Sequence, residues 1–312
     1  MAAVLCPDRA EMREFGIVVV THNSEAVVGA CLEAALATGA ELVVVDNASE
    51  DKTQLEVLRR PAARLISNPW NRGFAAAANQ GIEAVERPCV LLLNPDAVLE
   101  AGAETLAAAC DEHTAAAGGK LLGEDGRPQA GFAVRRLPTP LMLLGEVLGL
   151  NRIWPGNPVN RRYRCHDLDL DRPAQVEQPA GAFLMVRRAA WRELGGFDES
   201  FRPLWFEDVD FCQRARAAGY RIRYVPEAVA RHRGGHSADQ LPWDRRQLYW
   251  YDSLLRYSGK HFSPAAHRVM CLAVVLRSAL RALEGILVLR ARQATRVHGR
   301  IVWLGLQRLA CR

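Results

Sequence analysis

Residues 15–21 read Phe-Gly-Ile-Val-Val-Val-Thr, a run of β-branched side chains that predicts a short strand buried on both faces. Turn-forming and capping residues follow at 22–24, and a helix is expected from there to about Thr38, where Gly39 ends it. Further apolar strands, each followed by polar residues and a helical segment, come next along the chain. This alternation predicts an α/β fold with a mostly parallel sheet covered by helices.

A polar residue stands at the end of each predicted strand in this half of the chain. The strands are expected at residues 15–21, 41–45, 64–67 and 89–93, with helices at 52–59 and 73–85. The polar residues that follow them are Thr21, Asp46, Asn68, Asn94 and Asp96. Ligands of open parallel sheets bind at the carboxyl ends of the strands, so these side chains are expected to converge on one crevice.

Asp46 and Asp96 are the carboxylates of this crevice. Asp46 could accept a hydrogen bond from a nucleobase or a ribose hydroxyl, and Asp96 could hold a hard cation beside a diphosphate. A structural interpretation stays open for each, because Asp46 could form an Asx-turn and Asp96 could cap a helix. The chain has no G-x-G-x-x-G after the first strand and no G-x-x-x-x-G-K-[ST], which disfavours a dinucleotide oxidoreductase and a P-loop ATPase.

Residues 205–214, Trp-Phe-Glu-Asp-Val-Asp-Phe-Cys-Gln-Arg, place three carboxylates among large apolar side chains. At the start of a helix, Glu207, Asp208 and Asp210 would be favoured by the helix dipole alone. A partly buried carboxylate is costly unless it is paired, metal-bound or catalytic, so a catalytic site is the alternative. Asp210 is expected to pair with a nearby arginine.

The middle of the chain is less regular. Residues 124–175 are rich in proline and arginine and are expected to form a long, partly mobile excursion over the acceptor side of the active-site face. Their apolar segment 141–150 could be a packed helix or a contact for a lipid-linked partner. Residues 176–187 then predict one strand, in which Gly181 marks a close approach of the backbone.

Residues 220–225 predict an edge-like strand that ends before Pro226. His232 follows it in a loop. A lone histidine in a loop is usually structural, but a histidine that returns to a carboxylate-lined crevice is a candidate metal ligand beside Asp96.

Residues 241–312 predict a helical extension with apolar residues at helical spacing and a one-sided charge. From His267 onward a single acidic residue, Glu284, stands against the arginines 268, 277, 281, 290, 292, 296, 300 and 308. The helices could pack on the rest of the chain or on another subunit of a homo-oligomer. They could also form an amphipathic element that binds an anionic membrane surface.

The composition is that of an ordinary globular protein, with 312 residues, 49% of them apolar, and a net charge of +5. The eight cysteines include no C-x-x-C pair, which favours reduced thiols in the cytoplasm. Residues 1–14 form a tail without a secretory signal, and no run of about 18 apolar residues predicts a membrane span. No motif for nucleic-acid binding accompanies the positive charge.

Six short motifs occur in a fixed order along the chain. They are Asn71-Arg72-Gly73-Phe74 with Asn79-Gln80-Gly81, Leu93-Asn94-Pro95-Asp96, Gly181-Ala182-Phe183, Gly195-Gly196-Phe197-Asp198-Glu199, Glu207-Asp208-Val209-Asp210 and His232. This set resembles the family 2 glycosyltransferases, most closely the branch described as rhamnosyltransferases, and covers about residues 15–237. The resemblance implies a GT-A fold with a Rossmann-like sheet, a nucleotide-sugar donor, a divalent cation and inversion at the anomeric carbon.

The resemblance also implies a role for each matched residue. Asp208 would be the general base, and Glu207 would orient the acceptor. The donor side would consist of Thr21, Asn23, Asp46, Asn71, Arg72, Gly73, Asn79, Asn94 and Asp96. The acceptor side would consist of Gly181, Ala182, Trp205 and Glu207. Asp96 and His232 would hold Mg²⁺ or Mn²⁺, although Asn94 replaces the first carboxylate of the family's D-x-D motif.

The predicted enzyme is an inverting transferase that moves a sugar, with rhamnose from dTDP-rhamnose as the first choice, to a glycan or lipid-linked acceptor of a cell-surface polysaccharide. Its expected parts are a tail (1–14), a catalytic domain (15–240) and a basic helical extension (241–312) that binds the inner face of the cell membrane from the cytoplasm. The alternatives are another donor (UDP-galactofuranose, a UDP-hexose or a GDP-sugar), a sugar nucleotidyltransferase, or a non-catalytic protein that binds sugar nucleotides.

Overall fold

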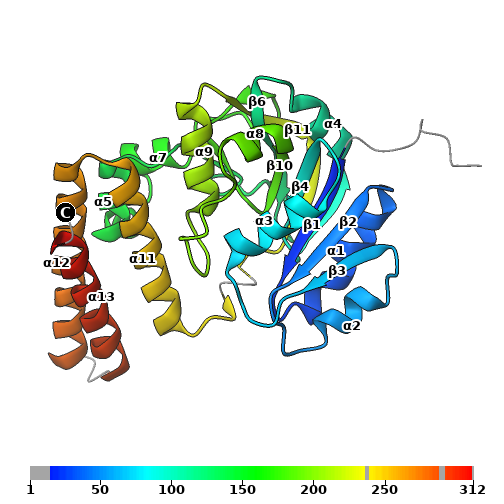
Figure 1. Ribbon diagram of the computed structural model, residues 1–312. Helices are drawn as coiled ribbons and strands as arrows, with labels where there is room; N and C mark the ends of the chain where they lie inside the picture. Colours follow the sequence, from blue (N-terminus) through cyan, green and yellow to red (C-terminus); the bar gives the residue numbers. More distant parts are fainter. Residues whose placement is uncertain (1–14, 236–238, 288–291, 311–312) are drawn as a thin grey trace, which may run out of the picture.

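The computed structural model of the protein describes residues 15–235, 239–287 and 292–310. The predicted tail, Arg290 and residues 236–237 therefore lie outside the described residues. A central sheet with helices against it occupies one side of the molecule, and the C-terminal helices stand together on the other side (Figure 1).

The first half of the sheet is the predicted alternation of strands and helices. Its elements are β1 (Phe15–Thr21), α1 (Glu25–Ala37), β2 (Glu41–Asp46), α2 (Thr53–Leu58), β3 (Ala63–Ser67), α3 (Phe74–Ala84) and β4 (Cys89–Leu93). β1 lies parallel to both β2 and β4, and β2 lies parallel to β3. The predicted parallel sheet is confirmed here. Strands β1, β2 and β4 are buried apolar runs as expected, whereas β3 at the edge is partly exposed.

The second half of the sheet is mixed. Its elements are β5 (Ala97–Ala101), α4 (Ala103–Ala109), β6 (Thr114–Leu122), β8 (Ala174–Gln175), β10 (Phe183–Arg187), α8 (Arg188–Glu193), α9 (Glu207–Ala217) and β11 (Arg221–His232). β10 lies antiparallel between β4 and β6, and β11 lies between β6 and β5. The strand order is β3-β2-β1-β4-β10-β6-β11-β5, with β8 paired to β11. Strand β6 was not predicted, because its alanines and glycines carry no β-branched signal.

Two strand predictions were wrong. The expected edge strand at 220–225 is the start of β11, which continues through Pro226 and lies inside the sheet. The register of β11 against β6 shifts between Val225 and Val229, and this irregularity accommodates the proline. The expected single strand at 176–187 is divided into β9 (Gln178–Pro179) and β10, because the chain turns aside at residues 180–182.

The predicted excursion at 124–175 is built largely of short helices. It contains β7 (Val134–Arg135), α5 (Pro140–Val147), α6 (Leu150–Ile153) and α7 (Pro158–Tyr163). The packed-helix interpretation of the apolar segment is confirmed for α5, whose Leu143 and Val147 are buried. The same helix keeps part of its apolar surface exposed, at Leu141 and Leu148.

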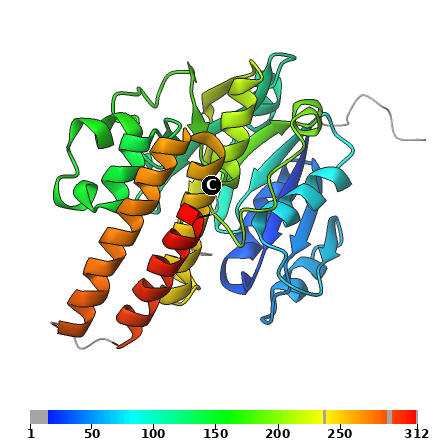
Figure 2. The ribbon, with the colours of Figure 1, turned by 60° about the vertical axis from the view of Figure 1, so that its left-hand side comes forward.

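The chain ends in three long helices, α11 (Trp243–His261), α12 (Pro264–Leu287) and α13 (Arg292–Ala310), which confirm the predicted helical extension. They pack on one another and on α5 (Figures 1 and 2). Their shared apolar cluster also takes in Phe201 and Phe206, which precede α9. The extension is therefore packed against the acidic stretch. Among the described residues, no helix contains a segment apolar and long enough to cross a bilayer.

Candidate active site

Asp46, at the end of β2, accepts hydrogen bonds from protein groups on both carboxylate oxygens. Thr21 Oγ1 donates to Asp46 Oδ1 over 2.9 Å, and Gln54 Nε2 donates to Oδ2 over 2.7 Å. The backbone N–H of Ser49, three residues on, also donates to Oδ2, over 3.0 Å. Asp46 thus has structural partners within its own loop, and its contact with a nucleobase stays a prediction. Asn23 acts on the same loop, since its Oδ1 accepts from the backbone N–H of Glu50.

Asn47, which follows Asp46, organises the predicted donor loop. Its Nδ2 donates to Asn71 Oδ1 over 3.0 Å and to the carbonyl oxygen of Gly73 over 3.2 Å. Its Oδ1 accepts from the backbone N–H of Arg72 over 3.0 Å and from Asn68 Nδ2 over 3.3 Å. The motif at 71–73 is thus held at the carboxyl ends of β2 and β3, where the sequence predicted it.

Strand pairing brings Asp96 and His232 together. β5 and β11 are antiparallel, and His232 lies opposite Ala97, the residue after Asp96. The two side chains are almost completely buried, and Nε2 of His232 lies 3.6 Å from Oδ1 of Asp96. Burial lowers the pKa of His232, and the charge of Asp96 opposes this shift. The sequence indicated the pair in two ways, through the expected return of the chain to a carboxylate-lined crevice and through the family resemblance.

Gln129 fixes the ring of His232. Its Nε2 donates to the carbonyl oxygen of His232 over 2.8 Å, so its Oε1 faces Nδ1 of the ring at 3.0 Å. An amide oxygen only accepts, so Nδ1 carries the proton and Nε2 presents its lone pair toward Asp96. Phe132 stacks on the same ring, with 5.3 Å between centroids. Metal-binding histidines are commonly oriented in this way through their other ring nitrogen, and no sequence pattern indicated the contact with Gln129.

The pair fits a divalent cation. Asp96 Oδ2 and His232 Nε2 are buried atoms without a hydrogen-bond partner within the described residues. Unpaired polar atoms in a buried site indicate a missing ligand. No group of three or more Cys, His, Asp or Glu side chains in the described chain forms a complete site, so diphosphate oxygens or water would supply the other ligands.

Residues 180–182 connect this pair to the acidic stretch. The backbone N–H of Gly181 donates to Oδ2 of Asp208 over 3.0 Å, and the carbonyl oxygen of Ala182 accepts from the N–H of Asn94 over 3.0 Å. A Cβ at position 181 would lie 3.2 Å from the same carboxylate oxygen. The close approach predicted at Gly181 is therefore an approach to Asp208.

Glu207 and Asp208 form a coupled pair of carboxyl groups. Burial raises the pKa of both, and the Asp208 charge raises that of Glu207 further, while the N–H groups of Gly181 and Val209 partly oppose the shift at Asp208. Oε2 of Glu207 is buried and has no partner among the described residues. A carboxylate with a raised pKa in a polar crevice is suited to take up a proton.

The backbone that leads into α9 is in an unusual conformation. Trp205 and Phe206 have φ values of 77° and 71°, in the left-handed region that large side chains avoid. Such strain persists only where packing fixes it, and Phe206 packs on Tyr257 of α11 with 5.3 Å between ring centroids. The C-terminal helices thus hold the turn that presents Glu207 and Asp208.

A family model described as "Glycosyltransferase like family 2" matches residues 13–253 of this sequence. The chain belongs to this family. An N-acetylglucosaminyl-diphospho-decaprenol L-rhamnosyltransferase from Mycobacterium tuberculosis is 30% identical over 70% of this chain and 75% of its own length. A pre-mycofactocin glycosyltransferase of the same organism is 27% identical over 72% of this chain and 43% of its own length.

The solved structures include the mannosyltransferase PcManGT from Pyrobaculum calidifontis in complex with GDP-Man and Mn²⁺. It superposes with a TM-score of 0.52 over all of this chain and 91% of that chain, at 17% identity. The protein is a glycosyltransferase with the predicted GT-A fold and a C-terminal helical extension.

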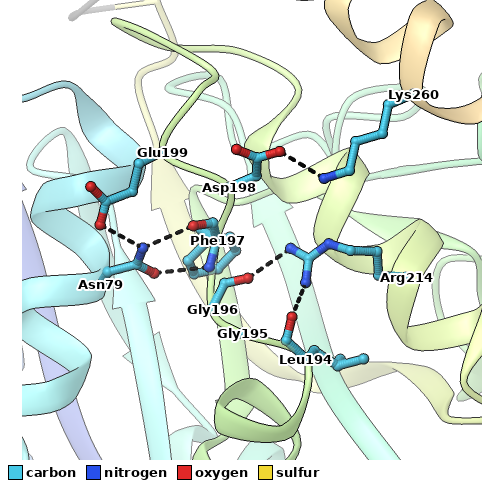
Figure 3. Close-up of a pocket in the computed structure, with 9 residues that line it drawn as sticks. All are labelled: Asn79, Leu194, Gly195, Gly196, Phe197, Asp198, Glu199, Arg214 and Lys260. Atoms are coloured by element: carbon cyan, nitrogen blue, oxygen red, sulfur yellow. Dashed lines mark hydrogen bonds and ion pairs between the residues drawn. The ribbon is translucent and has the colours of Figure 1, made fainter.

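Asn79 of this glycosyltransferase holds a turn. Its Nδ2 donates to the carbonyl oxygen of Phe197 over 2.8 Å and to Glu199 Oε1 over 3.1 Å, and its Oδ1 accepts from the N–H of Phe197 over 2.9 Å (Figure 3). The side chain lines a hollow of about 420 Å³ with residues 194–199, Arg214 and Lys260. These contacts explain Asn79 structurally, and its contact with the donor stays a prediction.

Asp210 of the glycosyltransferase is the structural member of the acidic stretch, as predicted. Its fully buried carboxylate pairs with Arg214 of α9 over 2.8 Å and with Lys260 and His261 of α11 over 2.7 Å each. Burial alone would raise its pKa, but the hydrogen bonds from His261, Lys260 and Arg214 hold it below its ordinary value. The network fastens α11 of the C-terminal extension to α9.

Asp210→Ala is expected to lower the free energy of unfolding by about 3 kcal/mol at pH 7, because Arg214, Lys260 and the ring of His261 lose a buried partner. A depressed pKa stabilises the fold above the unfolded-state value of about 3.9 and loses this effect as the pH falls through the folded value. Urea titrations at pH 7 and below pH 4 measure both effects. The control is Asp252→Ala. Asp252 also pairs with two cations, Arg256 and Arg308, but it is more exposed than Asp210, so its loss should cost less than about 1 kcal/mol. An Asp210 variant as stable as the control would contradict this role.

Proposed function

We propose that this glycosyltransferase transfers a sugar from a nucleotide-diphosphate donor to a hydroxyl of a glycan or lipid-linked acceptor, with inversion at the anomeric carbon. The observation that carries the proposal is the placement of Asp208. Its carboxylate is held by the N–H of Gly181, and the adjoining Ala182 is bonded to Asn94, two residues before Asp96. One base and one cation-binding pair thus lie on either side of a single short loop.

Asp208 is the proposed general base. A sugar hydroxyl is a weak nucleophile, and a carboxylate that takes its proton as the bond forms lowers the barrier. The new bond joins the acceptor oxygen to the anomeric carbon, and the bond from that carbon to the diphosphate breaks with its electron pair on the leaving oxygen. Direct displacement by one base inverts the anomeric carbon and requires no covalent intermediate on a second carboxylate.

Asp96 and His232 are the proposed ligands of Mg²⁺ or Mn²⁺. A divalent cation bound there would neutralise the negative charge that gathers on the departing diphosphate. Gln129 holds the neutral ring of His232 with Nε2 directed to this site. Position 94 is an asparagine, whose amide is neutral, where a carboxylate would add a second negative charge. Asp96 is therefore the one anionic ligand in the proposed pair of Asp96 and His232.

The donor loop around Asn71, Arg72 and Gly73 is the proposed site of the nucleotide or sugar phosphate, with Thr21, Asn23 and Asp46 beside it. Trp205 and Glu207 are proposed for the acceptor. The relative named as a decaprenol-linked L-rhamnosyltransferase supports dTDP-rhamnose as the donor and a lipid-linked glycan of the cell surface as the acceptor. Such an acceptor places the enzyme at the cytoplasmic face of the cell membrane, where the basic C-terminal helices would attract anionic lipid.

A donor screen tests this function. The protein is incubated with dTDP-rhamnose, UDP-sugars or GDP-sugars, with and without Mn²⁺ or Mg²⁺, and the release of free nucleoside diphosphate is measured. We expect release from one donor class, fastest from dTDP-rhamnose, and dependent on the cation. Release of pyrophosphate from a sugar phosphate and a nucleoside triphosphate would instead identify a nucleotidyltransferase. Binding without turnover of any donor, in the presence of lipid-linked acceptors, would identify a non-catalytic protein.

A further inference from the structure

Helix α12 exposes a continuous apolar stripe. Its members are each between 51% and 58% exposed and follow one another at intervals of three or four residues, which places them on one face of the helix. They are Val269, Leu272, Leu276, Leu280, Leu283 and Ile286. The opposite face buries Met270, Cys271 and Val274 in the cluster shared with α11 and α13. The stripe is therefore not needed to hold the helices together.

A second apolar surface lies beside the stripe, on α5 and α6. Ile153 is 83% exposed and Trp154 is 57% exposed. Leu150 at the start of α6, Leu148 just after α5 and Leu141 within α5 are exposed as well. Helix α5 packs on α12, and the two segments are neighbours in both views of the molecule (Figures 1 and 2). Segments far apart in the sequence thus expose large apolar side chains on the same part of the molecule. Monomeric proteins seldom expose an apolar area of this kind without a partner.

The exposed charges of these segments are mostly positive. The exposed arginines of these segments are Arg152, Arg161, Arg162, Arg268, Arg292, Arg296 and Arg300. The sequence of α5–α7 contains one acidic residue, Glu146, and that of α12 and α13 contains one, Glu284. Each of these two carboxylates pairs with an arginine, Arg164 and Arg281 respectively. The segments that carry the apolar surfaces consequently have a clear excess of exposed positive charge over negative charge.

Exposed apolar side chains together with an excess of arginines favour an anionic bilayer over a second copy of the chain as the partner of this surface. A second copy of the chain would bring arginines toward arginines in a symmetric interface, and like charges in such an interface cost free energy. A bilayer with anionic headgroups accepts both the apolar side chains and the flanking arginines. Since no described helix can span a bilayer, the contact would be with the membrane surface.

We propose that the α12 stripe and the α5–α6 surface together form one membrane-binding face that docks on anionic lipid. This inference deepens the proposed function, and it rests on it in one respect: an acceptor carried by a lipid must be reached from that face. The packing supports the connection, because Leu143 and Val147 of α5 share a cluster with Phe206. Ser253 of α11 also donates a hydrogen bond to the carbonyl oxygen of Leu204, over 3.2 Å. The face and the turn before Asp208 are therefore parts of one packed unit.

The test is co-sedimentation of the full chain with vesicles of phosphatidylcholine, with and without phosphatidylglycerol. One variant carries Leu276→Gln, Leu280→Gln and Leu283→Gln, and a second carries Ile153→Ser and Trp154→Ser. Each is expected to bind anionic vesicles at least about tenfold more weakly than the wild-type protein, since the variant lacks several methylene groups that would be buried in the membrane. A matched control carries Leu55→Gln and Leu58→Gln on α2, which are 53% and 62% exposed at a distant part of the fold, and should bind like the wild type.

Wild-type binding is also expected to weaken about tenfold or more when phosphatidylglycerol is omitted. The proposal is overturned if the wild-type protein does not sediment with anionic vesicles or if both variants bind as the wild type does. It is also overturned if light scattering shows a wild-type dimer that the α12 variant converts to a monomer, which would identify a second copy as the occupant.

Release of nucleoside diphosphate in the absence of vesicles is measured on the same samples. That release reports on the proposed transferase activity alone, so the activity and the membrane-binding face can be rejected independently. If the α12 variant is unfolded, the variant with Ile153→Ser and Trp154→Ser still tests the membrane-binding face.

Discussion

Asp208→Asn is expected to lower the rate of sugar transfer by about 10²- to 10⁴-fold while donor binding persists, because the variant keeps the shape of the side chain and loses the base. The substitution also preserves an oxygen that accepts the hydrogen bond of the Gly181 N–H. Loss of rate therefore reports on proton transfer rather than on disruption of the turn. The measurement is the turnover number at saturating donor and acceptor.

The control for this variant is Asp167→Asn, because Asp167 is an exposed carboxylate whose partner is Arg136. It should change the rate by less than about twofold. The wild-type rate should also fall at low pH with an apparent pKa above that of an ordinary carboxylic acid, since burial raises the pKa values of Asp208 and Glu207. A base must be deprotonated to act, so the active form is on the alkaline side of this transition. A profile that stays flat down to pH 4 would contradict the raised pKa values of Glu207 and Asp208.

Asp96→Asn is expected to lower the efficiency of transfer by about 10²- to 10³-fold, because it removes the charge that would hold a cation at the leaving diphosphate. Gln129→Leu should have a smaller effect and weaken Mn²⁺ binding by about 10- to 100-fold, since the ring of His232 would lose the partner that directs Nε2. Titration of Mn²⁺ in the presence of nucleoside diphosphate, followed by electron paramagnetic resonance, measures this affinity without turnover.

Asp125→Asn is the matched control for the metal site, since Asp125 is an exposed carboxylate in a nearby turn and should leave Mn²⁺ binding unchanged. Addition of a chelator to the wild-type enzyme should reproduce the loss caused by Asp96→Asn. If Asp96→Asn and Gln129→Leu kept full activity in the presence of the chelator, transfer would proceed without a cation at Asp96 and His232. The proposed base would then remain, and the role of Asp96 would have to be revised.

The sequence was sufficient for the parallel half of the fold because local signals there agree with one another. The strands around Val18, Val43 and Leu92 are uninterrupted apolar runs, and these three residues do lie side by side in the sheet. Polar residues mark the strand ends, where Thr21 and Asp46 are in contact. The second half was predicted less well, because β6 is made of small residues and β11 contains a proline within an irregularity of the ladder.

The candidate site divides in the same way. The acidic stretch at 205–214 was singled out from its density of carboxylates in an apolar context, a signal that is local and chemical, whereas the choice of Asp208 as the base came from the family resemblance. The pairing of Asp96 with His232 depends on the β5–β11 register, which no local pattern encodes. It was expected only in general terms, from the convergence of strand ends on one crevice and from the family resemblance. Gln129 and Asn47 were missed because a polar residue in a loop gives no sign of its partners. Their functions are defined by tertiary contacts with His232 and with residues 71–73.

The exposed face on α12 and α5–α6 shows what the sequence could and could not supply. Helical spacing of apolar residues was visible, but spacing alone does not say whether the apolar side is buried or exposed. In the structure the helix is apolar on both sides, and the side formed by Leu272, Leu276 and Leu280 is the one left exposed. The arginines that suggested a membrane contact are partly used in ion pairs, such as that of Arg308 with Asp252.

The central claim is that Asp208 acts as the base of a displacement at a separately bound donor. The most direct test measures, in one preparation of Asp208→Asn, the affinity for nucleoside diphosphate by calorimetry and the rate of transfer. We predict an affinity within about threefold of the wild-type value together with a rate reduced by at least about 10². Transfer at a near-normal rate by the folded variant would contradict the assignment of the base.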